Sequence, residues 1–176
     1  MTTVNAVNTY IVPTTNREVT VPSQPAFLAY QGTQDNNVTG DGTNYVLGDT
    51  NIGTTLTEIF DQNADFVAGA LGGAVFTAPV TGKYVLSCGI HSGGYDGTQS
   101  SRDNRVITSN GEYRGLKTNS TNTRNAANEI SSAAGIMADM DAADTCNITF
   151  RVEHGNKTVD VLNTNRNTFF SGYLAV

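Results

Sequence analysis

Short segments in which apolar and polar residues alternate recur along this chain. The clearest is residues 145–152, where Cys146, Ile148, Phe150 and Val152 alternate with Thr145, Asn147, Thr149 and Arg151. A period of two is typical of a β-strand with one buried and one solvated face. The pattern predicts further strands at residues 26–30, 56–61, 65–67, 74–77, 83–90, 105–108 and 112–114. Asn110-Gly111 predicts a hairpin turn between the last two of these.

The last predicted strand, residues 168–176, differs because both of its faces are apolar. Phe169, Tyr173 and Ala175 fall on one face, and Phe170, Leu174 and Val176 fall on the other. A strand of this kind has to be covered on both sides. One cover is the core of the domain, and we expect the second to come from a partner subunit. Residues 31–44 are rich in glycine and predict turns, and residues 117–125 predict a long polar loop.

The composition supports an all-β fold. Thr, Asn and Gly are abundant, only 15% of the 176 residues are charged, and the net charge is -6. Thr favours strands, whereas Asn and Gly favour the turns between them. With 10 Lys and Arg in total and no basic cluster, the chain lacks the signature of a nucleic-acid binder. It has no apolar run long enough for a membrane span and no Sec-type signal peptide, so we expect no membrane partner.

The chain divides into two unequal parts. Residues 1–24 contain Pro13 and Pro22 but no glycine, and we interpret them as an N-terminal arm that anchors or docks the protein. Within the arm, Tyr10, Ile11 and Val12 form the apolar segment that we expect to dock. Residues 25–176 then form a single domain.

The segment around Pro79 carries a strong pattern without any catalytic residue. Pro79 is expected to end the strand before it, Gly82 to permit the conformation of the corner, and Tyr84 to lie in the next strand. This predicts a structural corner. No nucleophile elbow, phosphate loop or set of zinc ligands is present, and we therefore expect no enzymatic activity.

Several motifs together resemble the complement C1q-like domain, the globular head related to tumour necrosis factor. The stretch Phe76-Thr77-Ala78-Pro79-Val80-Thr81-Gly82-Lys83-Tyr84 resembles the centre of that family, and Phe170-Ser171-Gly172-Tyr173-Leu174 resembles its C-terminal motif. The resemblance covers residues 25–176. It implies a jelly-roll sandwich of about ten antiparallel strands that assembles as a trimer and works by binding. It also implies that the first and last strands lie near the threefold axis, which assigns Phe27, Ala29, Phe169, Phe170, Tyr173 and Leu174 to the core and the trimer interface.

The surface and the arm are more like those of bacteriophage virion proteins that use this head. No Gly-X-Y stalk precedes the domain. We therefore expect a homotrimeric capsid decoration or cement protein, located in the virion and bound to the major capsid protein or another virion protein. The alternative is the receptor-binding head of a fibre, which would recognise a host surface glycan or protein. A secreted lectin or signalling ligand is disfavoured because no signal peptide is apparent.

Four aspartates are weak calcium candidates. Asp35 begins a stretch that partly imitates a calcium loop, and Asp139, Asp141 and Asp144 form an acidic cluster. The loop lacks the glutamate that a calcium loop requires, so we predict no metal or other cofactor, with calcium as the one alternative. Cys88 and Cys146 are expected to be reduced and buried, although pairing between them stays open.

Overall fold

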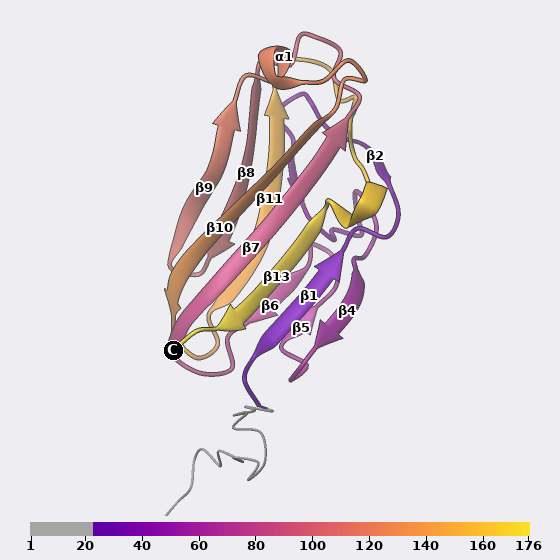
Figure 1. Ribbon diagram of the computed structural model, residues 1–176. Helices are drawn as coiled ribbons and strands as arrows, with labels where there is room; N and C mark the ends of the chain where they lie inside the picture. The colour runs from indigo at the N-terminus through magenta and orange to yellow at the C-terminus, as the bar shows by residue number, and fades with distance from the viewer. Residues whose placement is uncertain (1–22) are drawn as a thin grey trace, which may run out of the picture.

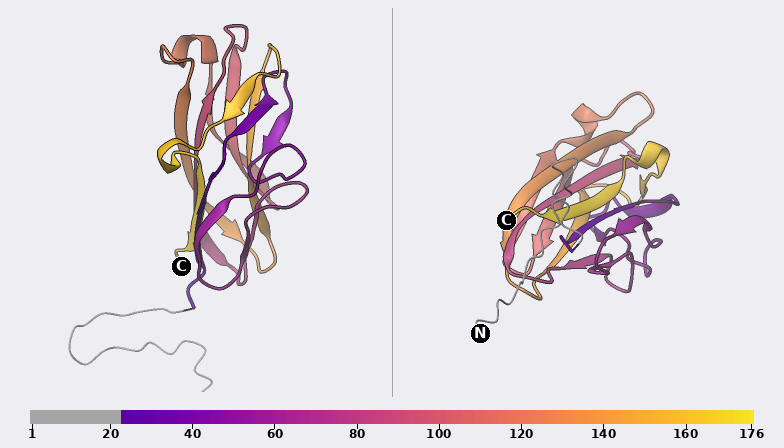
Figure 2. Two further views of the ribbon diagram at one scale, coloured as in Figure 1. Left: turned by 90° about the vertical axis from the view of Figure 1, so that its right-hand side faces the viewer. Right: turned by 60° about the horizontal axis from the view of Figure 1, so that its bottom comes forward.

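The structure is a computed structural model that describes residues 23–176. It consists of two antiparallel β-sheets packed face to face, with thirteen strands in the described residues (Figure 1). The two layers are visible edge-on in the left view of Figure 2. The expected docking residues Tyr10, Ile11 and Val12 lie outside the described residues, and the assignment of residues 1–24 as an arm stays a prediction.

The first sheet has seven strands, and its centre is the long strand β7. Its members are β1 (Ala26–Tyr30), β2 (Asp35–Thr39), β4 (Thr57–Asp61), β7 (Gly82–Gly93), β10 (Ile130–Met140), β12 (Val159–Val161) and β13 (Phe169–Leu174). Along one side β7 pairs with β10. Along the other side it pairs with β13 and then β12, and the sheet continues from β13 through β1 to β4. The chain therefore brings its first and last strands together at the middle of this sheet.

The second sheet has six strands arranged around β11. Its members are β3 (Asn44–Val46), β5 (Phe66–Val67), β6 (Val75–Thr77), β8 (Ser101–Thr108), β9 (Gly111–Thr118) and β11 (Thr145–Glu153). The strand β11 pairs with β8 on one side and with β6 and β3 on the other. The helical segments are the short α1 (Ser120–Thr123) and the 3-10 turn η1 (Thr164–Arg166). Within residues 23–176 no helix has the length and apolar character needed to span a membrane.

The core lies between the inward faces of the two sheets. At its centre the ring of Phe27 stacks on Phe66 and Phe76, at centroid distances of 4.5 and 4.9 Å. Phe170 meets Phe27 edge-on at 4.8 Å. Stacked and edge-on arrangements at these distances are favourable for aromatic side chains, beyond the apolar area that they bury. The four rings come from β1, β5, β6 and β13, so they join the two sheets.

The predicted strands are confirmed, and the Asn110-Gly111 hairpin joins β8 to β9 as expected. Residues 31–44, predicted to be rich in turns, contain bends but also the strand β2, which was not predicted. The alternation of apolar and polar residues did not predict this strand, because its buried residues include Asp35, whose carboxylate is held inside the domain by hydrogen bonds. The polar segment 117–125 also contains the end of β9 and the helix α1. Four strands of the structure, β2, β3, β10 and β12, have no counterpart among the predicted segments.

The corner around Pro79 separates β6 from β7, as predicted, and Tyr84 lies buried in β7 with its hydroxyl donating to the carbonyl of Val80 at 2.8 Å. Gly82 was predicted to be required for its backbone conformation, and this reason is wrong. Its φ lies outside the left-handed region, but a Cβ at this position would lie 2.8 Å from the carbonyl oxygen of Val176. Glycine is therefore required because the C-terminal segment passes directly against it.

The two cysteines are free thiols buried between the sheets, Cys88 on β7 and Cys146 on β11. Burial raises the pKa of both thiols. Both groups are therefore neutral and weakly nucleophilic near neutral pH.

Candidate interaction surface

One face of the seven-stranded sheet points away from the core, and we call it the open face. The strand alternation defines it, because Phe27, Ala29 and Phe170 point inward while their neighbours along the strand point outward. Its residues are Ala26, Leu28 and Tyr30 of β1, Thr57, Ile59 and Phe60 of β4, Lys83, Val85, Ser87, Gly89 and His91 of β7, Ser131, Ala133, Gly135, Met137 and Asp139 of β10, and Phe169, Ser171 and Tyr173 of β13. Apolar and small residues dominate this set.

The strand register arranges the open face in rows. In one row Met137, Val85 and Tyr173 lie side by side on β10, β7 and β13. In the next row Gly135, Ser87 and Ser171 are followed by Leu28 and Phe60. The row of Gly135, Ser87 and Ser171 is therefore low, whereas larger side chains stand in the rows beside it and on β4. Met137 is 61% exposed at one edge, and Ile59 is 44% exposed at the other.

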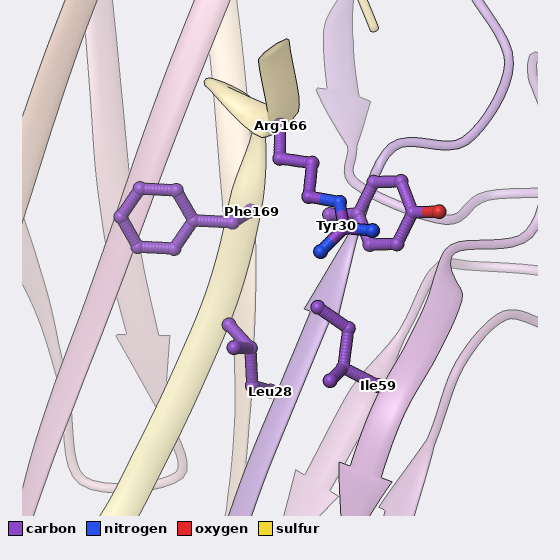
Figure 3. Close-up of a pocket in the computed structure, with 5 residues that line it drawn as sticks. All are labelled: Leu28, Tyr30, Ile59, Arg166 and Phe169. Atoms are coloured by element: carbon purple, nitrogen blue, oxygen red, sulfur yellow. The ribbon is translucent and has the colours of Figure 1, made fainter.

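A pocket of about 290 Å³ lies in the open face between β1, β4 and β13. Leu28, Tyr30, Ile59 and Phe169 form its apolar walls, and Arg166 reaches over it from η1 (Figure 3). The guanidinium lies over the ring of Tyr30, with its central carbon 4.7 Å from the ring centroid. A cation stacked on an aromatic ring in this way is attracted to the negative face of the ring. Apart from this cationic rim, the pocket offers apolar surface.

The backbone that carries Arg166 is unusual. Asn165 and Arg166 have φ values of +53° and +56°, so two successive residues other than glycine adopt the left-handed conformation. Each such residue is less favourable than in a right-handed conformation, and Arg is less tolerant of it than Asn. The turn thus holds Arg166 above Tyr30 at a conformational cost. Within residues 23–176 no carboxylate pairs with this guanidinium.

The outward face of the six-stranded sheet has the opposite character. Asp103 on β8 binds Arg105 at 2.9 Å and lies 3.6 Å from Arg114 of β9. Glu112 contacts both arginines, each at 3.3 Å. On β11 a further ion pair joins Arg151 and Glu153 at 2.6 Å. Hydrogen bonds to Asp103 raise the pKa of Arg105. This face, which we call the charged face, satisfies its charges internally and is compatible with water.

The interface residues expected from the sequence separate into two groups. Phe27, Ala29 and Phe170 are fully buried in the core of the single chain, so they do not form an exposed surface. Phe169 and Tyr173 lie on the open face, and Tyr173 is 48% exposed. Leu174 is partly buried and packs against the core. Of the six residues, only Phe169 and Tyr173 are therefore placed to contact another molecule.

The four aspartates do not come together as a metal site. Asp35 is 3% exposed, and its carboxylate accepts hydrogen bonds from Gln31, Tyr45 and Thr54. Asp139, Asp141 and Asp144 lie in and after β10, where Asp144 accepts from the backbone N–H of Asp141 and from the side chain of Asn110. Residues 23–176 contain no group of three or more His, Cys, Asp or Glu side chains arranged to hold a metal ion.

Sequence reasoning missed the pocket residues Leu28, Tyr30, Ile59 and Arg166. A signal for two of them was present, because Ala26–Tyr30 is apolar on both faces in the same way as the last strand. Ile59 and Arg166 carried no such signal. They reach the pocket only because β4 pairs along one side of β1 and Arg166 of η1 lies over Tyr30 at its end, which sequence periodicity does not reveal.

The chain matches no protein-family model and no curated protein in sequence. Solved structures do match its fold. The globular domain of zebrafish complement 1qA is 16% identical, covers 88% of this chain and 98% of its own, and aligns with a TM-score of 0.55. Murine APRIL, of the tumour necrosis factor family, is 8% identical over 87% of this chain and 100% of its own, also with a TM-score of 0.55.

A third structure of the same kind is a phage protein. Vertex protein P5 of PRD1 is 8% identical, covers 86% of this chain and 97% of its own, and aligns with a TM-score of 0.52. Identities this low carry information about the fold alone. All three structures share one architecture with the present chain, and its fold is the jelly roll of the tumour necrosis factor and C1q-like heads.

Proposed function

We propose that this protein is a non-enzymatic structural component of a phage particle, displayed on the capsid as a homotrimer that buries the open face. The observation that carries the proposal is the contrast between the two sheets. The charged face pairs its charges and suits water, whereas the open face exposes Tyr173, Met137 and Ile59 beside a low row of small residues.

Burial of the open face is favourable for a simple reason. Each square ångström of apolar surface removed from water contributes about 25 cal/mol, and an extended apolar patch on a soluble domain usually marks an interaction site. The small residues Gly135, Ser87 and Ser171 allow another chain to approach the sheet closely. A homotrimer supplies that second chain without requiring a different protein.

The placement on a phage particle is supported by the likeness to PRD1 vertex protein P5 and by the sparsely charged surface. In the proposed arrangement three N-terminal arms, with Tyr10, Ile11 and Val12, engage one threefold site on the shell. Three weak contacts made at once bind far more tightly than one, because the second and third form at a high effective concentration. The major capsid protein is the partner that this arrangement requires.

Light scattering after size-exclusion chromatography tests the trimer, with the intact chain and with a variant lacking residues 1–24. We expect three times the chain mass of 18.6 kDa for the intact protein and an equally trimeric head without the arm. Binding to purified shells should be lost only in the variant without the arm. A monomer in both cases would contradict the proposed assembly.

A second candidate is a receptor-binding head that recognises a host glycan or surface protein. The likeness to P5 favours this second candidate, because P5 is a vertex protein and a particle has few vertices. Copy number separates the two candidates. A decoration protein should be present in hundreds of copies per particle, whereas a vertex or fibre head should be present in far fewer. Quantitative mass spectrometry of purified particles measures this number directly.

A further inference from the structure

We propose that the side chain of Met137 in one copy inserts into the pocket formed by Leu28, Tyr30, Ile59 and Phe169 in the next copy. This inference rests on the proposed homotrimer and names the contact that closes it. Two features of the open face, an exposed apolar side chain and an apolar pocket, then become the two halves of one interface.

Met137 has the properties of an inserting group. It is 61% exposed although it is apolar, and it lies on β10, an edge strand whose partner strand in the described residues is β7 alone. Its neighbours on the same face are Gly135 and Asp139, so it stands above Gly135 on one side. Methionine is unbranched and flexible, and it adapts well to irregular apolar gaps.

The pocket has the properties of a receiving site. Its walls are apolar, and its volume of about 290 Å³ has room for a methionine side chain. The rim carries the guanidinium of Arg166, which stacks on Tyr30 and has no carboxylate partner within residues 23–176. The outer edge of β10 carries backbone carbonyl groups with no partner strand in the described part of the chain. Arg166 can donate hydrogen bonds to these carbonyls once Met137 is seated.

The two features cannot meet within one molecule. β10 lies at one edge of the sheet and β4 at the other, with β7, β13 and β1 between them, which places them about 19 Å apart at about 4.8 Å per strand. Contact therefore requires a second copy, joined head to tail. Such a contact between two different surfaces generates a closed ring when the rotation between copies closes.

The direction of the strands is compatible with this arrangement. The strands of this sheet run obliquely across the long axis of the sandwich (Figure 1). Met137 lies in the half of β10 that is drawn lower in Figure 1, and the pocket lies at the Tyr30 end of β1. Because the strands are oblique, these two places can come together when one copy is rotated onto the next about an axis parallel to the long axis of the sandwich.

Cysteine cross-linking in the full-length protein tests the contact. The double variant Met137→Cys/Ile59→Cys is treated with a short thiol-reactive bismaleimide and run on a denaturing gel, with each single variant beside it. The native thiols Cys88 and Cys146 are buried and should not react. We expect covalent trimers from the double variant and mostly uncross-linked chains from the single variants. The matched control is Met137→Cys/Leu71→Cys, because Leu71 is 82% exposed but lies off the open face.

The outcomes separate this inference from the proposed function. If light scattering gives a trimer and the Met137/Ile59 pair cross-links no better than the Met137/Leu71 pair, the contact is overturned while the trimer stands. If the protein is a monomer, both the Met137 contact and the proposed trimer fail.

A variant that needs no cross-linker gives a second readout. Met137→Ser should raise the dissociation constant of the trimer at least about tenfold, since one buried methionine side chain is lost at every contact, whereas Leu71→Ser should leave it unchanged.

Discussion

The hydroxyl of Tyr45 on β3 donates a hydrogen bond to the carboxylate of Asp35 on β2, and both side chains are buried. Gln31 and Thr54 donate to the same carboxylate, at 2.8 and 2.9 Å. Asp35 is thus the centre of a buried polar cluster that ties β2, β3 and the following loop together, and its oxygens are occupied by protein donors. This explains why an acidic residue in a predicted turn is part of a buried strand.

Replacement of Asp35 by Asn should destabilise the fold. An amide presents an N–H group to neighbours that are themselves donors, and it removes the negative charge that strengthens their hydrogen bonds. We expect a loss of about 2–3 kcal/mol in the free energy of unfolding, measured by urea denaturation. The control is Asp41→Asn, an exposed carboxylate that accepts from the backbone of Thr43. Equal losses in the two variants would contradict the role given to Asp35.

Alkaline pH should weaken the fold through Tyr45. Burial raises the pKa of this phenol above its usual value near 10, and the hydrogen bond to Asp35 acts in the same direction. The folded state therefore binds the phenol proton more tightly than the unfolded state. The stabilisation is complete below pH 10 and is lost as the pH rises through the range above it.

Tyr45→Phe should be less stable at pH 7 but should lose stability less steeply above pH 10. Equal slopes for this variant and the wild type would refute the assignment, and Tyr113→Phe, at an exposed position, is the control.

The buried guanidinium of Arg102 gives a less obvious prediction. It donates to the hydroxyl of Tyr95 at 3.0 Å, to Ser132 at 2.7 Å and to the carbonyl of Ile90 at 3.1 Å, and its central carbon lies 5.1 Å from the centroid of the Phe150 ring. Burial lowers its pKa. Lysine in this position keeps a buried charge but cannot satisfy all three acceptors.

We therefore expect Arg102→Lys to cost about 3 kcal/mol, and Arg102→Met to cost less. Methionine removes the charge, and two of the three acceptors retain another partner, since Tyr95 also bonds Ser92 and Ser132 also bonds Asn104. Urea denaturation of both variants measures the order. A methionine variant less stable than the lysine variant would show that the charge itself stabilises the fold.

Gly82→Ala tests the close approach of the C-terminal segment. The added Cβ would lie 2.8 Å from the carbonyl oxygen of Val176 and 2.6 Å from a methyl group of Leu174. The leucine side chain can move, but the carbonyl of Val176 accepts a hydrogen bond from the backbone N–H of Lys83 at 2.8 Å, which a shift would weaken. We expect a loss of about 1–3 kcal/mol, in the range of overpacked sites. At Gly111 the nearest atoms are 3.7 Å away, so Gly111→Ala should change the stability much less.

The sequence predicted the fold well because the alternation of buried and exposed positions is regular where strands have an apolar core. It placed Cys146, Ile148, Phe150 and Val152 on one buried face, and all four are fully buried. It failed at β2, where a buried carboxylate replaces an apolar residue, and at β10, where small Ser, Ala and Gly residues leave little apolar alternation. It also failed at Gly82, where the constraint comes from residues almost a hundred positions away.

The candidate site was predicted in part. The two apolar faces of the last strand indicated an outward surface, and Phe169 and Tyr173 lie on it. Residue type alone could not separate this surface from the core, which is why Phe27, Ala29 and Phe170 were grouped with it. The pocket required tertiary structure, because Ile59 and Arg166 meet Tyr30 only when distant segments fold together.

The most direct test of the account is to place a charge on the open face and measure the mass of the protein in solution. Tyr173 is 48% exposed in the single chain, so Tyr173→Lys should fold, and the charge should be tolerated unless this face is buried between copies. The account predicts a trimer for the wild type and for Leu71→Lys, and a monomer with an unchanged circular dichroism spectrum for Tyr173→Lys. A Tyr173→Lys protein that remains as trimeric as the wild type would contradict the claim that the open face is the interface.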